Sequence, residues 1–137
     1  MTGKTKTIKQ TVFLPATPAR VYEAFTNARV HSDFTGSKAT CTARTGGKFS
    51  AYDGYIQGKI KALEEGSRIV QEWHTTEWPH GAPPSTVEFT LKAKGDGTEL
   101  TMIHSDVPAE QAESYRQGWI DYYWEPLKEY FSRRRLP

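Results

Sequence analysis

The spacing of large apolar residues near the end of the chain predicts a long helix. Between positions 109 and 131 these residues recur at steps of three and four, which places them on one helix face. Pro108 precedes the segment and Lys128 lies near its end, as suits the two termini of a helix. The residues of this stripe are Tyr115, Trp119, Tyr122, Tyr123, Leu127, Tyr130 and Phe131. A helix with so many aromatic side chains on one face needs a broad apolar partner.

Two residues inside this segment are unusual for a helix. Gly118 costs about 1 kcal/mol relative to Ala in a helix interior, so it indicates either a close approach to the backbone or a bend. Pro126 removes an amide hydrogen bond and crowds the preceding turn, which predicts a kink between Tyr122 and Pro126. The alternative is a pair of shorter core helices.

The N-terminal pattern predicts one strand followed by two short helices. Residues 6–14 alternate between apolar and polar side chains, which is typical of a strand. Thr17 and Pro18 suit the cap and the first residue of a helix that runs to about Asn27. Asn27 can cap a second helix, which ends at Gly36.

From Ser37 to the long helix, the pattern has period two and predicts an antiparallel sheet. Asp53-Gly54 is a strong signal for a two-residue hairpin. The expected strands are 39–43, 48–52, 55–63, 68–75, 86–94 and 98–107. This order of elements predicts an α+β fold with about six to seven antiparallel strands and helices on one face. The inward residues stay open, because a slip of one residue exchanges the two faces of a strand.

Composition indicates one domain, over residues 1–137, with a sizeable core. The chain is 36% hydrophobic and 25% charged, and its net charge of +2 gives no reason to expect a polyanionic partner. No apolar run approaches the roughly 20 residues of a membrane helix, so we expect no membrane insertion. The N-terminus lacks the apolar core of a signal peptide. The single cysteine, Cys41, excludes an internal disulfide and favours a cytoplasmic protein.

Motifs for catalysis, metals and cofactors are missing from the sequence. There is no HExxH pair, no phosphate-binding or dinucleotide-binding glycine motif and no GxSxG. His74 and His104 lie on predicted strands and could meet across the sheet, although hydrogen-bonded or solvated histidines are the simpler expectation. Aromatic and basic residues are not interleaved as nucleic-acid binding requires. We therefore expect no catalytic residue, metal, cofactor or nucleic-acid partner, with catalysis as a minor alternative.

Two features could carry a binding function. The aromatic stripe either fills a solid core or lines a cavity between helix and sheet. The loop over residues 77–85 is rich in Pro and Gly and contains Trp78 and His80. An exposed Trp can anchor a protein partner. Trp78 could equally fold back over the mouth of the cavity.

A set of short motifs resembles a known family. They are Gly46-Gly47-Lys48-Phe49, Asp53-Gly54, Gly58, Glu72-Trp73, Trp78-Pro79, Gly81, Gly97-Thr98-Glu99-Leu100, Arg116-Gln117-Gly118-Trp119 and Tyr122-Tyr123. In this order and spacing the sequence resembles the family of activators of heat-shock protein 90 ATPase, within the START-like (SRPBCC) superfamily. The resemblance covers nearly the whole chain and is closest to the C-terminal domain of the eukaryotic activator. It implies a helix-grip fold, in which the sheet wraps around the long C-terminal helix.

The resemblance implies two functions for a non-enzymatic binding module. The first is co-chaperone-like docking on heat-shock protein 90 in the stress response, through Trp78, His80 and the sheet surface. The eukaryotic activator's separate N-terminal domain has no counterpart in this sequence, which weakens that expectation. The second is a carrier or sensor of a small hydrophobic ligand. The expected cavity residues are Phe49, Trp73, Phe89, Met102, Tyr115, Trp119, Tyr122 and Tyr123.

Overall fold

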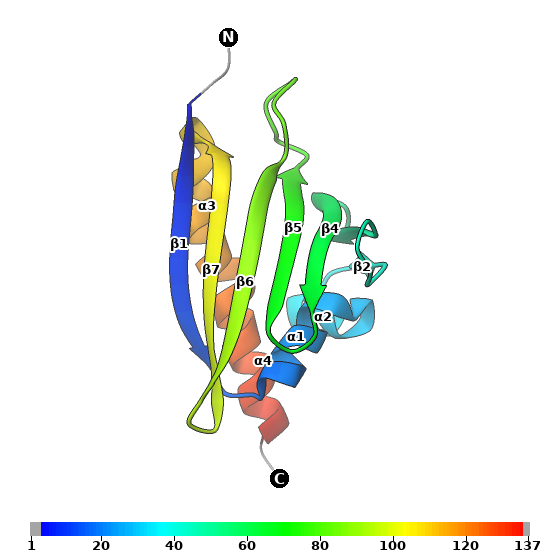
Figure 1. The fold of residues 1–137 in the computed structure, drawn as a ribbon, viewed down its shortest axis with the longest axis vertical. Helices are drawn as coiled ribbons and strands as arrows, with labels where there is room; N and C mark the ends of the chain where they lie inside the picture. The colour runs from blue at the N-terminus through cyan, green and yellow to red at the C-terminus, as the bar shows by residue number, and fades with distance from the viewer. Residues whose placement is uncertain (1–3, 136–137) are drawn as a thin grey trace.

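The computed structural model describes residues 4–135, in which seven strands form one sheet (Figure 1). Each strand pairs antiparallel with its neighbours in the order β1-β7-β6-β5-β4-β3-β2. The strands are β1 (Thr5–Leu14), β2 (Thr40–Cys41), β3 (Lys48–Ala51), β4 (Ile56–Glu64), β5 (Arg68–Thr75), β6 (Ser85–Lys94) and β7 (Gly97–Pro108). The predicted α+β class is confirmed. β2 is shorter than the pattern indicated.

The two short helices begin and end at the predicted residues. Helix α1 (Pro18–Thr26) begins after Thr17, whose hydroxyl accepts a hydrogen bond from the amide of Arg20. Helix α2 (Ala28–Thr35) begins after Asn27, whose side-chain oxygen accepts from the amides of residues 29 and 30. These bonds satisfy amides that have no partner within the first turn. Gly36 ends α2 with a left-handed φ of 72°.

The C-terminal helical segment is interrupted where the sequence predicted a kink. It consists of a 3₁₀ turn η1 (Ala109–Gln111), helix α3 (Ala112–Trp119), a π-helical segment η2 (Ile120–Trp124) and helix α4 (Glu125–Arg135). Pro126 has no amide hydrogen, so the Tyr122 carbonyl, four residues earlier, loses its α-helical donor. The Tyr52 hydroxyl donates to that carbonyl instead, at 2.5 Å. The irregularity is therefore stabilised by a contact from a distant part of the chain.

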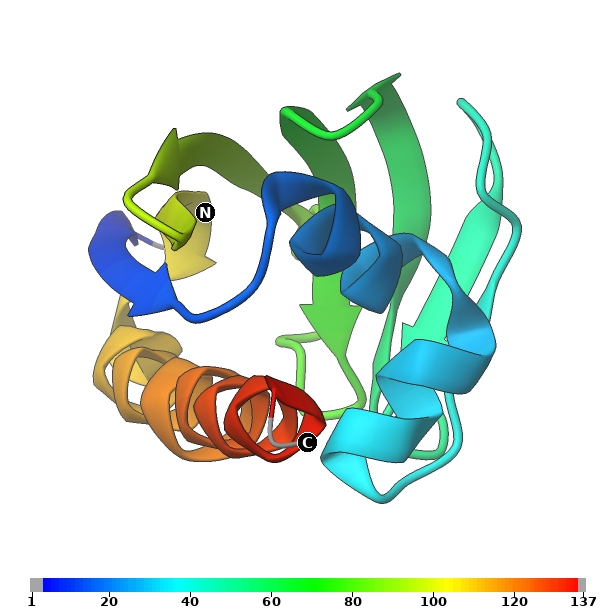
Figure 2. The same cartoon turned by 90° about the horizontal axis from the view of Figure 1, so that it is seen from below.

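The sheet curves around the C-terminal segment. Figure 2 shows this segment nearly end-on, against the concave side of the sheet and next to α2. The interior is rich in aromatic contacts: Phe25 of α1 stacks on Phe89 of β6 at 4.4 Å, and Trp119 stacks on Trp124 at 5.5 Å between ring centroids. Leu127 and Phe131 of α4 are fully buried. The helices thus cover one face of the sheet, and the other face is exposed.

The loop between β3 and β4 differs from its prediction. The sequence indicated strands over 48–52 and 55–63 with a two-residue turn at Asp53-Gly54. In the structure the strands end at Ala51 and resume at Ile56. Tyr52, Asp53 and Gly54 all have positive φ, at 50°, 56° and 89°. The longer loop turns Tyr52 out of the strand and towards the C-terminal segment.

None of the helices within residues 4–135 has the length and apolar character needed to cross a membrane.

Candidate functional site

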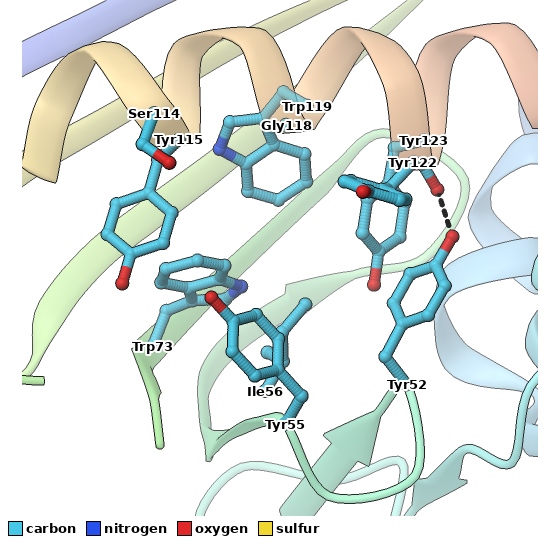
Figure 3. Close-up of a pocket in the computed structure, with 10 residues that line it drawn as sticks. All are labelled: Tyr52, Tyr55, Ile56, Trp73, Ser114, Tyr115, Gly118, Trp119, Tyr122 and Tyr123. Carbon is cyan, nitrogen blue, oxygen red and sulfur yellow. Dashed lines mark hydrogen bonds between the residues drawn. The ribbon is translucent and has the colours of Figure 1, made fainter. Parts of the chain in front are cut away.

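A cavity of about 390 Å³ lies between the C-terminal segment and the loop that joins β3 to β4. Small-molecule pockets commonly span about 300–1,000 Å³ and are lined mainly by apolar and aromatic groups. Figure 3 shows rings from both sides converging on this space. The lining residues are Tyr52, Tyr55, Ile56, Trp73, Ser114, Tyr115, Gly118, Trp119, Tyr122 and Tyr123. The aromatic stripe therefore borders a cavity, in addition to packing in a core.

On the sheet side, the loop places two tyrosines at the mouth of the cavity. The Tyr52 hydroxyl bonds to the Tyr122 carbonyl, and the Tyr55 hydroxyl donates to the Glu77 carboxylate at 2.5 Å. Burial raises the pKa of Tyr52 to about 12. Burial and the bond to Glu77 raise the pKa of Tyr55 above its ordinary value. Both phenols therefore keep their protons at neutral pH.

On the helix side, Gly118 lets the cavity reach the backbone. A Cβ atom added there would meet no atom closer than the Tyr122 ring, at 3.8 Å. A glycine in this position removes a side chain that would otherwise project into the cavity. Gly118, which is unfavourable in a helix interior, thus lies where the helix borders the open space of the cavity.

Behind the cavity wall, a chain of buried hydrogen bonds joins the Trp119 indole to the backbone of Trp73. The Trp119 indole N–H donates to Nδ1 of His104 at 3.1 Å. Nε2 of His104 therefore carries the proton and donates to Oγ of Ser85 at 2.8 Å, because an indole can only donate. Ser85 in turn donates to the carbonyl of Trp73 at 2.6 Å. Burial lowers the pKa of His104 to about 3, so this histidine is neutral.

A second buried histidine supports the other end of the cavity. Nε2 of His31, on α2, lies 2.9 Å from the hydroxyl of Tyr123. His31 also stacks on Phe34 at 5.0 Å between ring centroids. Burial lowers the pKa of His31 to about 4 and raises the pKa of Tyr123 well above its ordinary value. Tyr123 thereby joins the cavity wall to helix α2.

The residues expected in a cavity fall into two groups. Trp73, Tyr115, Trp119, Tyr122 and Tyr123 line it. Phe89 and Met102 are fully buried in the core behind it, and Phe49 is buried in the same core without lining the cavity. Sequence reasoning did not name Tyr52, Tyr55, Ile56, Ser114 and Gly118 as cavity residues. Of these five residues, only Gly118 could have been recognised from the sequence, because a glycine inside a helix without a cap role is unusual.

Trp78 lies half-buried between the cavity and the exposed face of the sheet. Its ring contacts Trp73 at 6.1 Å and Tyr115 at 5.9 Å between centroids, and its indole N–H donates to the Pro83 carbonyl. It also borders a groove of about 500 Å³ across β3, β4 and β5, together with Lys48, Lys59 and Pro84. His80 is exposed in the same loop.

The histidines on the strands do not meet. His104 is fully buried on the concave face, whereas His74 is half-exposed and borders the groove on the opposite face, so the suggested contact is wrong. Strand β6 separates their strands, and their side chains point to opposite faces of the sheet. Within residues 4–135, no three His, Cys, Asp or Glu side chains are grouped as a metal site requires.

An antiparallel sheet closed around a C-terminal helix, with an aromatic cavity between them, defines a START-like helix-grip domain. The family model described as "Activator of Hsp90 ATPase homolog 1-like protein" matches residues 15–132. The chain belongs to this family. It is 38% identical over 125 residues to the human activator of 90 kDa heat shock protein ATPase homolog 1, and 34% identical over 129 residues to the Dictyostelium discoideum homologue.

These matches cover most of this chain and part of each relative. They include 91% and 93% of this chain, but 36% of the human protein and 33% of the Dictyostelium one, so the chain spans about a third of their length. Among solved structures, an HSP90 activator from Plasmodium falciparum superposes with a TM-score of 0.82 at 24% identity. That superposition covers 95% of this chain and 97% of the other, and it shows a shared fold.

Proposed function

We propose that the protein is a cytosolic, non-enzymatic binding module that docks on a 90 kDa heat-shock chaperone and stimulates its ATPase. The observation that carries this proposal is the 38% identity to the human activator over 91% of the chain. The chain spans about a third of that relative.

The groove on the exposed face of the sheet is a suitable docking surface. Trp78 and Pro84 supply apolar area, and Lys48 and Lys59 are exposed beside them. Interfaces commonly combine an aromatic anchor with a polar rim that guides association. Lys48 and Lys59 are paired opposite each other on β3 and β4, and Glu72 lies opposite Lys59 on β5, so the groove carries two positive charges and one negative charge.

The test is the ATPase rate of the source organism's chaperone at increasing concentrations of this protein. We expect a saturable rise in the rate. Lys59→Glu should raise the concentration needed for half-maximal stimulation by about three- to tenfold, because a charge at an interface rim mainly affects association. Lys9→Glu is the matched control, because Lys9 is exposed on β1 at the opposite edge of the sheet.

A flat ATPase response with folded protein would reject the proposal. Equal effects of Lys59→Glu and Lys9→Glu would show instead that general charge, and not the groove, governs stimulation. Trp78→Ala is less suitable as a first variant, because Trp78 packs against Trp73 and Tyr115 and its truncation also changes the cavity.

The cavity favours a second function: a carrier or sensor of a small ligand. Its supporting observation is the space of about 390 Å³ beside Gly118, bordered by rings from both the sheet and the helix. This function is compatible with docking on a protein, because Trp78 contacts the cavity residues Trp73 and Tyr115 while bordering the groove.

A further inference from the structure

The cavity beside the C-terminal segment presents aromatic faces and oxygen atoms, but no cationic side chain. Its lining residues, all in the described part of the chain, include two indoles and five phenols and no Lys, Arg or His. A negative charge lies beside the cavity at the carboxylate of Glu77, which accepts the hydrogen bond of the lining residue Tyr55. Figure 3 shows Tyr55, Trp73, Tyr115 and Trp119 around a common space. The cavity is therefore surrounded by groups with a negative electrostatic potential, namely aromatic ring faces and oxygen atoms.

The hydroxyl protons of three tyrosines around the cavity, Tyr52, Tyr55 and Tyr115, are already engaged. Tyr52 donates to the Tyr122 carbonyl, and Tyr55 donates to Glu77. Gln111 settles the direction at Tyr115: its amide nitrogen donates to the Glu77 carbonyl at 2.7 Å. Its amide oxygen then accepts from the Tyr115 hydroxyl at 2.9 Å. The Thr75 hydroxyl, 2.6 Å from the Tyr115 oxygen, must then donate to it and occupies one of its lone pairs. A hydroxyl has one proton and two lone pairs, so these three tyrosine oxygens can meet a ligand only as acceptors.

The remaining polar groups of the lining are neutral. The Trp119 N–H donates to His104 in the wall, which leaves its ring face for the cavity. Trp73, Ser114 and Tyr122 add an indole and two hydroxyl groups. Such groups can solvate a ligand, but they cannot neutralise a carboxylate or phosphate removed from water.

We propose that the cavity binds an organic cation, with a quaternary ammonium or protonated amine head on an apolar body. Aromatic faces attract cations through their negative potential, most strongly where water is excluded. Phenol oxygens with committed protons add acceptors for an amine, and Glu77 attracts positive charge to the mouth. The inference rests on the proposed small-ligand function and names the chemical class of that ligand.

The test uses two probes of the same shape that differ in charge. They are 4-hydroxyphenyltrimethylammonium and 4-tert-butylphenol, each titrated into the full chain by calorimetry, with 4-tert-butylbenzoate as an anion. We expect the cation to bind at least about tenfold more tightly than the phenol, and the benzoate to bind most weakly. Equal or tighter binding of the phenol would overturn the inference and leave the small-ligand function standing. Binding of none of the three would overturn both.

Two variants locate the site. Gly118→Leu places a side chain in open space, and should abolish binding of both probes without loss of thermal stability. Retained cation binding in this variant would overturn the inference. Glu77→Gln keeps an acceptor for Tyr55 but removes the charge, and should lower cation affinity about threefold while leaving phenol affinity unchanged. Glu65→Gln, exposed in the turn after β4, is the matched control and should change neither.

Discussion

At the scale of single residues, Tyr52 and Pro126 form a functional pair although they do not bond to each other. Pro126 leaves the Tyr122 carbonyl without its helical donor, and Tyr52 supplies the replacement. The position of Tyr52 depends on a loop in which three consecutive residues have positive φ. The hydrogen bond that explains a tyrosine at this loop position is therefore made to a residue 70 positions later in the sequence.

This pairing makes a testable prediction about stability. Tyr52→Phe should lower the free energy of unfolding by about 1 kcal/mol, because the carbonyl loses its hydrogen bond. In a Pro126→Ala background the amide of residue 126 can supply that bond, so the same substitution should cost clearly less. Chemical denaturation of the four proteins in this cycle measures the difference. Equal costs in the two backgrounds would contradict the pairing.

Residue-level signals in the sequence were informative where the interaction is local. Thr17, Asn27 and Gly36 were identified as caps because a cap bonds to amides or carbonyls within its own turn. Tyr52 and Tyr55 were placed at strand ends, since the Asp53-Gly54 signal is local and their partners are distant. Distance along the chain, more than residue type, decided which site residues could be predicted.

At the scale of elements, Trp119 joins the C-terminal segment to three strands. Its ring contacts Trp73 of β5, Phe89 of β6 and His104 of β7, with centroid distances between 5.7 and 5.8 Å. Its side chain is 3% exposed, and its indole N–H is bonded. The helix is therefore attached to the sheet by packing and by one buried polar chain at the same position.

Trp119→Ala should accordingly destabilise the fold strongly. We expect a loss of roughly 3–5 kcal/mol in the free energy of unfolding, from the cavity created and from the loss of the donor to His104. Trp119→Phe keeps an aromatic ring but not the donor, and serves as the control with a smaller loss. Urea denaturation gives both values. A cost below about 1 kcal/mol for the Ala variant would show that the segment is held elsewhere.

At the scale of the whole molecule, two neutral histidines are sealed between the layers. His31 joins α2 to the C-terminal segment, and His104 joins β7 to it. Burial lowers the pKa of these histidines to about 4 and about 3, from an ordinary value of 6.5. As pH falls below about 6.5, the unfolded chain takes up protons that the folded chain does not, so acid favours unfolding.

Stability should therefore fall with pH before most carboxylates titrate. Between pH 6.5 and 5 we expect a slope of up to roughly 1.4 kcal/mol per pH unit for each of the two histidines. This stability is fully present above pH 6.5. Denaturation curves at several pH values measure the slope, and His31→Gln should remove about half of it. A slope unchanged by this substitution would mean that His31 titrates normally in the folded state.

The overall architecture was more predictable than the site. Period-two alternation and local turn residues are sufficient for an α+β order with a long final helix, and these were confirmed. The location of the cavity depends on which face each strand turns inward. Glu72, for example, borders the outer groove, while the next residue, Trp73, lines the cavity. A one-residue change of register would exchange such assignments, so alternation alone leaves them open.

The π-helical segment resolves a problem of rotational phase. Tyr115, Trp119, Tyr123, Leu127 and Phe131 are spaced four residues apart, and all are buried. In a regular α-helix each step of four overshoots a full turn by about 40°, so four steps would rotate the last side chain by roughly 160° from the first. The wider turn at Ile120–Trp124 advances less per residue and offsets part of this drift. Because that turn accommodates one extra residue, deleting one residue there should restore an ordinary helix and still leave Leu127 and Phe131 facing the sheet.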